Sequence, residues 1–77
     1  MNIKSVIESI LFYHGEPMAI HRLAKFLAKD ETEIASAIHE LQEEYGSRQG
    51  GMIIVTHDHK AQMTTNPAHA SYLRELL

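Results

Sequence analysis

Cysteine is absent from this sequence of 77 residues. Without cysteine the chain can form neither a disulfide framework nor a thiolate zinc site, and this composition fits a reducing compartment. We therefore expect a cytoplasmic protein.

Long apolar runs are also absent. The N-terminal segment has an apolar stripe, but the polar residues Lys4, Ser5, Glu8 and Ser9 interrupt it, so it lacks the continuous apolar core of a signal peptide. No apolar run approaches the roughly 18 residues needed to cross a bilayer. We expect no association with a membrane.

The sequence also lacks a surplus of basic residues. Ten Asp and Glu residues outnumber seven Lys and Arg residues, which gives a net charge of −3 and a pI near 6.0. Domains dedicated to nucleic-acid binding are usually basic, often with a pI above about 9. The charge balance therefore argues against DNA as the main partner.

Catalytic motifs are not found either. The sequence has no glycine-rich phosphate loop, no nucleophile elbow and no helical His-Glu-x-x-His pattern. Glu43 and Glu44 are adjacent on a helix and do not face each other, so they offer no support for acid–base chemistry. We expect no enzymatic activity, no metal and no cofactor.

Helical periodicity is the main feature that is present. The first stripe has the spacing of a helix over residues 3–14, capped by Asn2 and ended by Gly15. A second stripe predicts a helix over residues 20–28, with a weak start because Ala19 offers no capping side chain. A third begins at Asp30, which forms a variant capping box with Glu33, and ends near Tyr45 or Gly46.

The pattern changes after residue 46. "MIIVT" and "AQMTT" are typical of two strands joined by the polar turn "HDHK", and "NPAHASYLRELL" predicts a closing helix capped by Asn66 and running to the last residue. Three helices, a two-stranded wing and a C-terminal helix form a winged helix-turn-helix, an α+β fold that is mostly helical. Residues 1–77 make one such domain.

The third helix would be the DNA-reading element of this fold. It carries five glutamates and no lysine or arginine over residues 31–45, so phosphates would repel it. The remaining basic residues, among them Lys25, Arg48 and Lys60, are too scattered to form a cationic platform. A transcription regulator that contacts DNA mainly through its wing remains the alternative function, while direct DNA binding by the third helix is expected to be weak or absent.

Two histidines in the wing share a side if both are extended, which is a spacing used by zinc and nickel sites. They are His57 and His59, and the sequence offers no obvious third ligand. We interpret them as solvated turn residues.

Apolar residues in excess of one small core favour a protein-interaction surface. Phe12 lies about half a turn of the helical wheel from the first stripe, and Tyr13 lies at its edge. "MIIV" is apolar on both faces of a sheet that can bury only one, so Met52, Ile53 and Val55 complete the candidate interface. Alternatively, the C-terminal helix folds back and covers the hairpin.

Four blocks of the sequence, in order, resemble the N-terminal winged-helix domain of the segregation and condensation protein B family. They are "IESILFYHGEPMAIHRLAKFL", "EIASAIHELQEEY", "GGMIIV" and "AQMTTNPAHASYLREL". The resemblance covers nearly the whole chain. It departs from the family pattern at "HDHK", where relatives often have glycines, and at Ala19, where they often have serine.

The resemblance implies a non-enzymatic subunit of the bacterial chromosome condensation and segregation complex, associated with the nucleoid through that complex. Such subunits form homodimers and bind the kleisin that bridges the heads of the SMC ATPase. In the family two winged-helix domains follow one another, and the N-terminal one is linked chiefly to dimerisation. We therefore expect residues 1–77 to be the N-terminal half of a longer two-domain protein.

Overall fold

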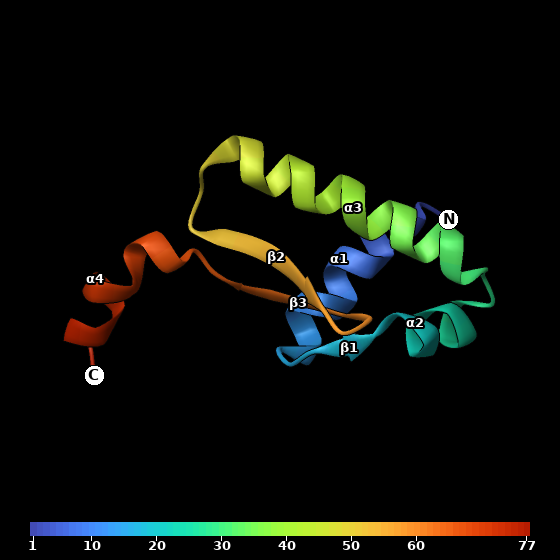
Figure 1. The fold of residues 1–77 in the computed structure, drawn as a ribbon, viewed down its shortest axis with the longest axis horizontal. Coiled ribbons are helices and arrows are strands. Elements are labelled where there is room, and N and C mark those ends of the chain that lie inside the picture. Colours follow the sequence, from blue (N-terminus) through green and yellow to red (C-terminus); the bar gives the residue numbers. More distant parts are fainter.

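The computed structural model describes all of residues 1–77 as helices around a small antiparallel sheet (Figure 1). In chain order the elements are α1 (Ile3–His14), β1 (Met18–Ala19), α2 (Ile20–Leu27), α3 (Glu31–Arg48), β2 (Met52–His57), β3 (Lys60–Thr65), a 3₁₀ turn η1 (Pro67–His69) and α4 (Ala70–Glu75). The expected winged-helix order is confirmed, with a third strand added.

The first helix has the bounds that its periodicity predicts. The Asn2 side chain accepts a hydrogen bond from the Ser5 amide, and Gly15 ends the helix in the left-handed conformation with φ 74°. Ile7 and Leu11 are buried on its inner face. The apolar stripe therefore sets which side of α1 faces the core.

The short strand β1 was not predicted from the sequence. Its two residues pair with β3 in the sheet order β1-β3-β2. The pairing also serves α2, because the Ile20 amide donates to the carbonyl of His59 at 3.0 Å, which replaces the side-chain cap that Ala19 lacks. The weak start of α2 is thus compensated by the tip of the wing.

Two predictions for the third helix were wrong in detail. Asp30 is the N-cap residue, but its side chain makes no capping hydrogen bond, so the predicted capping box does not form. The helix also continues past Gly46 to Arg48, whose guanidinium lies 5.0 Å from the ring centre of Tyr45. Gln49, with φ 53°, then ends it.

The core lies between α1, α2, α3 and the inner face of the sheet. α3 supplies four of its members and α4 supplies none. Its buried residues are Ile7, Leu11, Met18, Leu23, Ala24, Ile34, Ala37, Ile38, Leu41, Ile54, Ala61 and Met63.

The C-terminal helix stands apart from this core. Figure 1 shows α4 beyond the end of the hairpin, at the opposite end of the molecule from α2. It begins with the predicted Asn66 cap, but its first turn is 3₁₀ and it ends at Glu75 rather than at the last residue. α4 therefore does not fold back over the hairpin.

Candidate protein-interaction surface

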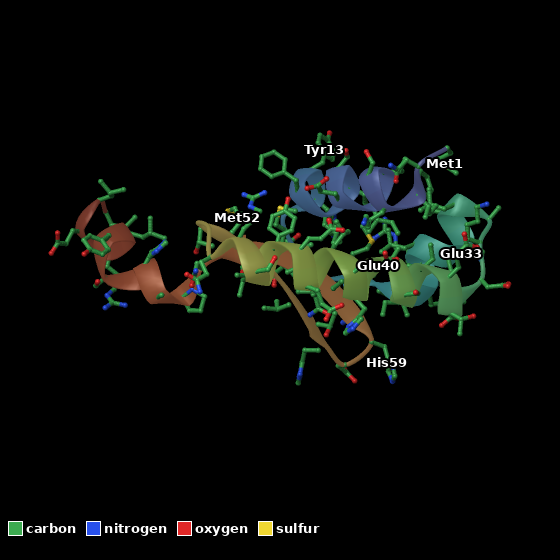
Figure 2. The ribbon with its side chains drawn as sticks, turned by 90° about the horizontal axis from the view of Figure 1, so that it is seen from above. Met1, Tyr13, Glu33, Glu40, Met52 and His59 are labelled. Atoms are coloured by element: carbon green, nitrogen blue, oxygen red, sulfur yellow. The ribbon has the colours of Figure 1, made fainter.

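Three aromatic side chains stand exposed around a groove between α1 and α2, which we call the aromatic groove. Phe12 is 71% exposed, Tyr13 92% and Phe26 76%. The groove encloses about 720 Å³, and its apolar lining includes the buried Met18 and Leu23. Figure 2 shows Tyr13 pointing outward from α1. A concave apolar surface rimmed by aromatics is typical of a contact site for another protein.

The sequence predicted two of these aromatics and missed the third. Phe12 lies off the buried stripe of α1, as the helical wheel indicates, and Tyr13, expected at the edge of the stripe, is also exposed. Phe26 lies off the stripe of α2 in the same way, beside the buried Leu23 and Ala24. The same wheel argument, applied to α2, would have identified Phe26.

The hairpin contributes a separate surface. Ile54 points into the core, and Val55, on the other face of β2, is exposed beside a small hollow that it shares with Pro17 and Gln62. Ile53 is half-buried. Met52 is half-buried and packs against the core, so its side chain is partly withdrawn from any partner.

The outer face of α3 is acidic, as the sequence indicates. Glu33, Glu40 and Glu43 are exposed on it, and Figure 2 shows Glu33 and Glu40 along this helix. Lys4 of α1 pairs with Glu44 and lies 3.9 Å from Glu40. The hydrogen bond with Glu44 raises the pKa of Lys4 above its ordinary value. One of the few cations is therefore already engaged, and α3 offers no cationic platform for phosphates.

A second contact ties α1 to α3. The Tyr45 hydroxyl donates a hydrogen bond to the Glu8 carboxylate, and this bond, aided by partial burial, raises the pKa of Tyr45. This pair joins the two helices on the side of Lys4 and Glu44. It has a structural role, since neither group lines the aromatic groove.

The histidines of the wing do not come together with other metal-ligating residues. His57 ends β2, and His59 lies at the hairpin tip, as Figure 2 shows. Asp58 and His59 both have positive φ, 52° and 60°, as a two-residue hairpin turn requires. The structure contains no group of three or more His, Cys, Asp or Glu side chains placed to hold a metal ion.

No helix of the structure combines the length and the apolar character that a bilayer crossing requires.

The chain matches a known family over almost its whole length. Residues 5–77 match the family model "Segregation and condensation complex subunit ScpB". Segregation and condensation protein B of Clostridium botulinum strain Kyoto is 35% identical over 74 residues, covering 96% of this chain and 38% of that protein. The Clostridioides difficile protein of the same name is 35% identical over 78 residues, covering 99% of this chain and 44% of that protein. The chain thus spans less than half the length of these curated relatives.

Solved structures give the same fold. A crystal structure described as a dimer of the ScpB N-terminal domain complexed with ScpA peptide superimposes with a TM-score of 0.86 at 28% identity, covering 96% of this chain and 93% of that one. ScpB from Mycobacterium tuberculosis superimposes with a TM-score of 0.88 at 22% identity, covering 96% of this chain and 46% of that one. The second likeness concerns the fold alone.

Proposed function

Because the chain belongs to the segregation and condensation complex subunit ScpB family, we propose that it is a non-enzymatic, homodimerising module of a bacterial chromosome condensation and segregation complex. It acts through contacts with a second copy and with a kleisin, and through the kleisin with the SMC ATPase. Residues 1–77 act as the N-terminal winged-helix domain of a two-domain protein, in the cytoplasm and on the nucleoid.

The observation that carries this proposal is the exposed apolar surface. Phe12 and Tyr13 rim the aromatic groove and are exposed, and leaving such rings in water is unfavourable unless a partner covers them. The structural relative at 28% identity is a dimer with a bound ScpA peptide. Dimerisation and peptide binding are the two uses that this surface suits.

The hairpin residues of the proposed interface differ in how far a partner can reach them. Val55 and the half-buried Ile53 lie on the outer face of the sheet, where a partner can reach them. Met52 packs against the core, and its role is to support β2 from beneath. The aromatic groove and the outer face of the hairpin can therefore serve two different partners.

Light scattering at high micromolar concentration tests the proposal. We expect the chain to be dimeric, and we expect Phe12→Asp to weaken the dimer by about 30-fold, the equivalent of about 2 kcal/mol at an interface anchor. Ser36→Asp is the matched control, because it adds the same charge at an exposed site of α3 outside the groove. A monomer at all concentrations, unchanged by Phe12→Asp, would remove dimerisation from the proposal.

A DNA titration separates the alternative function from this one. With an acidic α3 and Lys4 already paired, we expect little binding to duplex DNA even at low salt, where electrostatic contacts are strongest. Fluorescence anisotropy measures this directly. Tight binding that weakens steeply with salt would favour a regulator that reads DNA through its wing.

A further inference from the structure

A short segment, residues 15–19, joins the two helices that line the aromatic groove. It contains β1, and Met18 within it belongs to the groove lining. The two walls of the groove, α1 and α2, each pack more extensively on α3 than on each other. Their relative position therefore depends on α3 and on the contacts that hold the connecting segment.

The hairpin of β2 and β3 holds this segment at its start, its middle and its end. At the start, the Gln62 side chain donates a hydrogen bond to the Gly15 carbonyl at 3.2 Å. In the middle, β1 pairs with β3. At the end, the Ile20 amide donates to the His59 carbonyl at 3.0 Å. Figure 1 shows the segment passing the tip of the hairpin on its way from α1 to α2. The hairpin thus contacts the whole connection between the groove walls.

The contacts that hold the segment are few. β1 has two residues, and α2 begins without a side-chain cap. A strand this short opens locally at a small cost in free energy, so the loss of one hydrogen bond changes the open population measurably. Gln62 is the member of this set that acts through its side chain, and it bonds the residue that ends α1, directly after His14 of the groove lining.

We propose that Gln62 is a positioning residue for the aromatic groove. Its hydrogen bond to Gly15 holds the end of α1 and the connecting segment against the hairpin, and it thereby keeps Met18 in place between the two walls. Without this bond the segment separates from β3 more often, and the groove loses the shape that a partner recognises. The inference rests on the protein-interaction role proposed above and names a residue outside the groove that controls it.

Hydrogen exchange in dilute protein tests the positioning role without any partner. We expect Gln62→Ala to make the Ile20 amide exchange about fivefold faster, relative to the amide of the buried Ile38, which reports global unfolding. Gln42→Ala is the matched control. Gln42 is also half-buried and also donates to a backbone carbonyl at 3.2 Å, but on β2, away from the connecting segment. The control should leave the ratio of the two exchange rates unchanged.

Two further variants separate the hydrogen bond from the packing of the Gln62 side chain. Gln62→Glu keeps the length of the side chain and loses the N–H donor, so it should behave like Gln62→Ala. Gln62→Lys keeps a donor and should restore slow exchange of the Ile20 amide in part. In NMR spectra, the Met18 methyl signal should shift in Gln62→Ala and stay in place in Gln42→Ala.

Sedimentation equilibrium measures the consequence for binding. We expect Gln62→Ala to weaken the dimer about fivefold, and Gln42→Ala to change it by less than about twofold. Far-ultraviolet circular dichroism confirms that both variants are folded.

The outcomes separate this inference from the proposed function. If Gln62→Ala and Gln42→Ala give the same ratio of Ile20 to Ile38 exchange, Gln62 does not position the segment and the inference is overturned. A weaker dimer with unchanged exchange also overturns it, because Gln62 then contacts the partner directly. If exchange responds as expected but the unmodified chain is a monomer at every concentration, the positioning role stands and the proposed homodimer is wrong.

Discussion

The body of this molecule and its last helix differ in what holds them. In the body, twelve residues from α1 to β3 form a single buried cluster, and α3 alone supplies four of them. In α4 no residue is buried, although Tyr72 and Leu73 are large apolar residues. The body is stabilised by packing within the chain. α4 makes its main packing contacts with η1 alone.

The first way to test this comparison is to truncate one core side chain and one side chain of similar size at the end of α4, where Leu76 is the C-cap. Ile38→Ala should lower the free energy of unfolding by about 3 kcal/mol, because Ile38 is 1% exposed and its loss leaves a cavity. Leu76→Ala should change it by less than about 0.5 kcal/mol when the chain is monomeric, because Leu76 is 81% exposed. Urea denaturation at low protein concentration measures both.

Equal losses in the two variants would show that α4 packs on the body in solution. The contrast between the two regions would then be wrong.

The next prediction concerns Asn66, which lies between β3 and η1 and connects the body to α4. Asn66→Ala should cost about 1 kcal/mol, because it removes both the cap on the Ala68 amide and the bond to the Gly50 carbonyl. Asn66→Asp keeps the capping oxygen and loses the amide donor, so it should cost less than the alanine variant. Thermal unfolding monitored by circular dichroism gives the values.

If both Asn66 variants lose the same stability, the hydrogen bond to the Gly50 carbonyl, and not the cap on the Ala68 amide, accounts for the effect. If neither has an effect, the Asn66 hydrogen bonds do not fix the direction of α4.

Within the body, a smaller effect tests how α1 and α3 are joined. Tyr45→Phe should lower the free energy of unfolding by about 1 kcal/mol at neutral pH, because it removes the hydrogen bond to Glu8. In the folded chain the hydrogen bond to Glu8 raises the pKa of Tyr45 above its ordinary value. The stabilisation is therefore fully present below about pH 10, and it is lost as the pH rises through the higher pKa of the folded state.

Urea midpoints of the two chains across this alkaline range provide the measurement, with Tyr13→Phe as the control, because the Tyr13 hydroxyl has no hydrogen-bond partner in the structure and its ring is 92% exposed. A constant difference between Tyr45→Phe and the unmodified chain up to the highest pH would contradict the assigned hydrogen bond.

Local signals predicted most of the fold. The periodicity of α1, with Asn2 before it and Gly15 after it, determines both ends of that helix. The buried stripe of α3 through Ile34, Ala37, Ile38 and Leu41 was likewise evident from spacing. These signals lie within a few residues of the elements that they define.

What the sequence could not reveal depends on contacts between distant segments. β1 has two residues, too few for a strand pattern, and it forms because Met18 and Ala19 pair with Ala61 and Lys60. α3 continues to Arg48, whose side chain lies over the Tyr45 ring, whereas Gly46 alone suggests an earlier end.

The candidate site was predictable in part. Phe12 and Tyr13 follow from the wheel of α1, but the groove that they rim exists only because α2 packs beside that helix. The half-buried position of Met52 depends on how β2 packs on α3. The position of α4 away from the core depends on the hydrogen bond of Asn66 with the Gly50 carbonyl. The exposure of an apolar residue can be inferred from the pattern of one helix, but the shape of the groove depends on how two helices pack.

Sedimentation equilibrium of the unmodified chain, from low micromolar to near millimolar concentration, tests the central claim most directly. We predict that the apparent mass rises with concentration from the 8.7 kDa of one chain to twice that value, as the exposed aromatic side chains become covered. An apparent mass that stays at 8.7 kDa over the whole range would contradict the account.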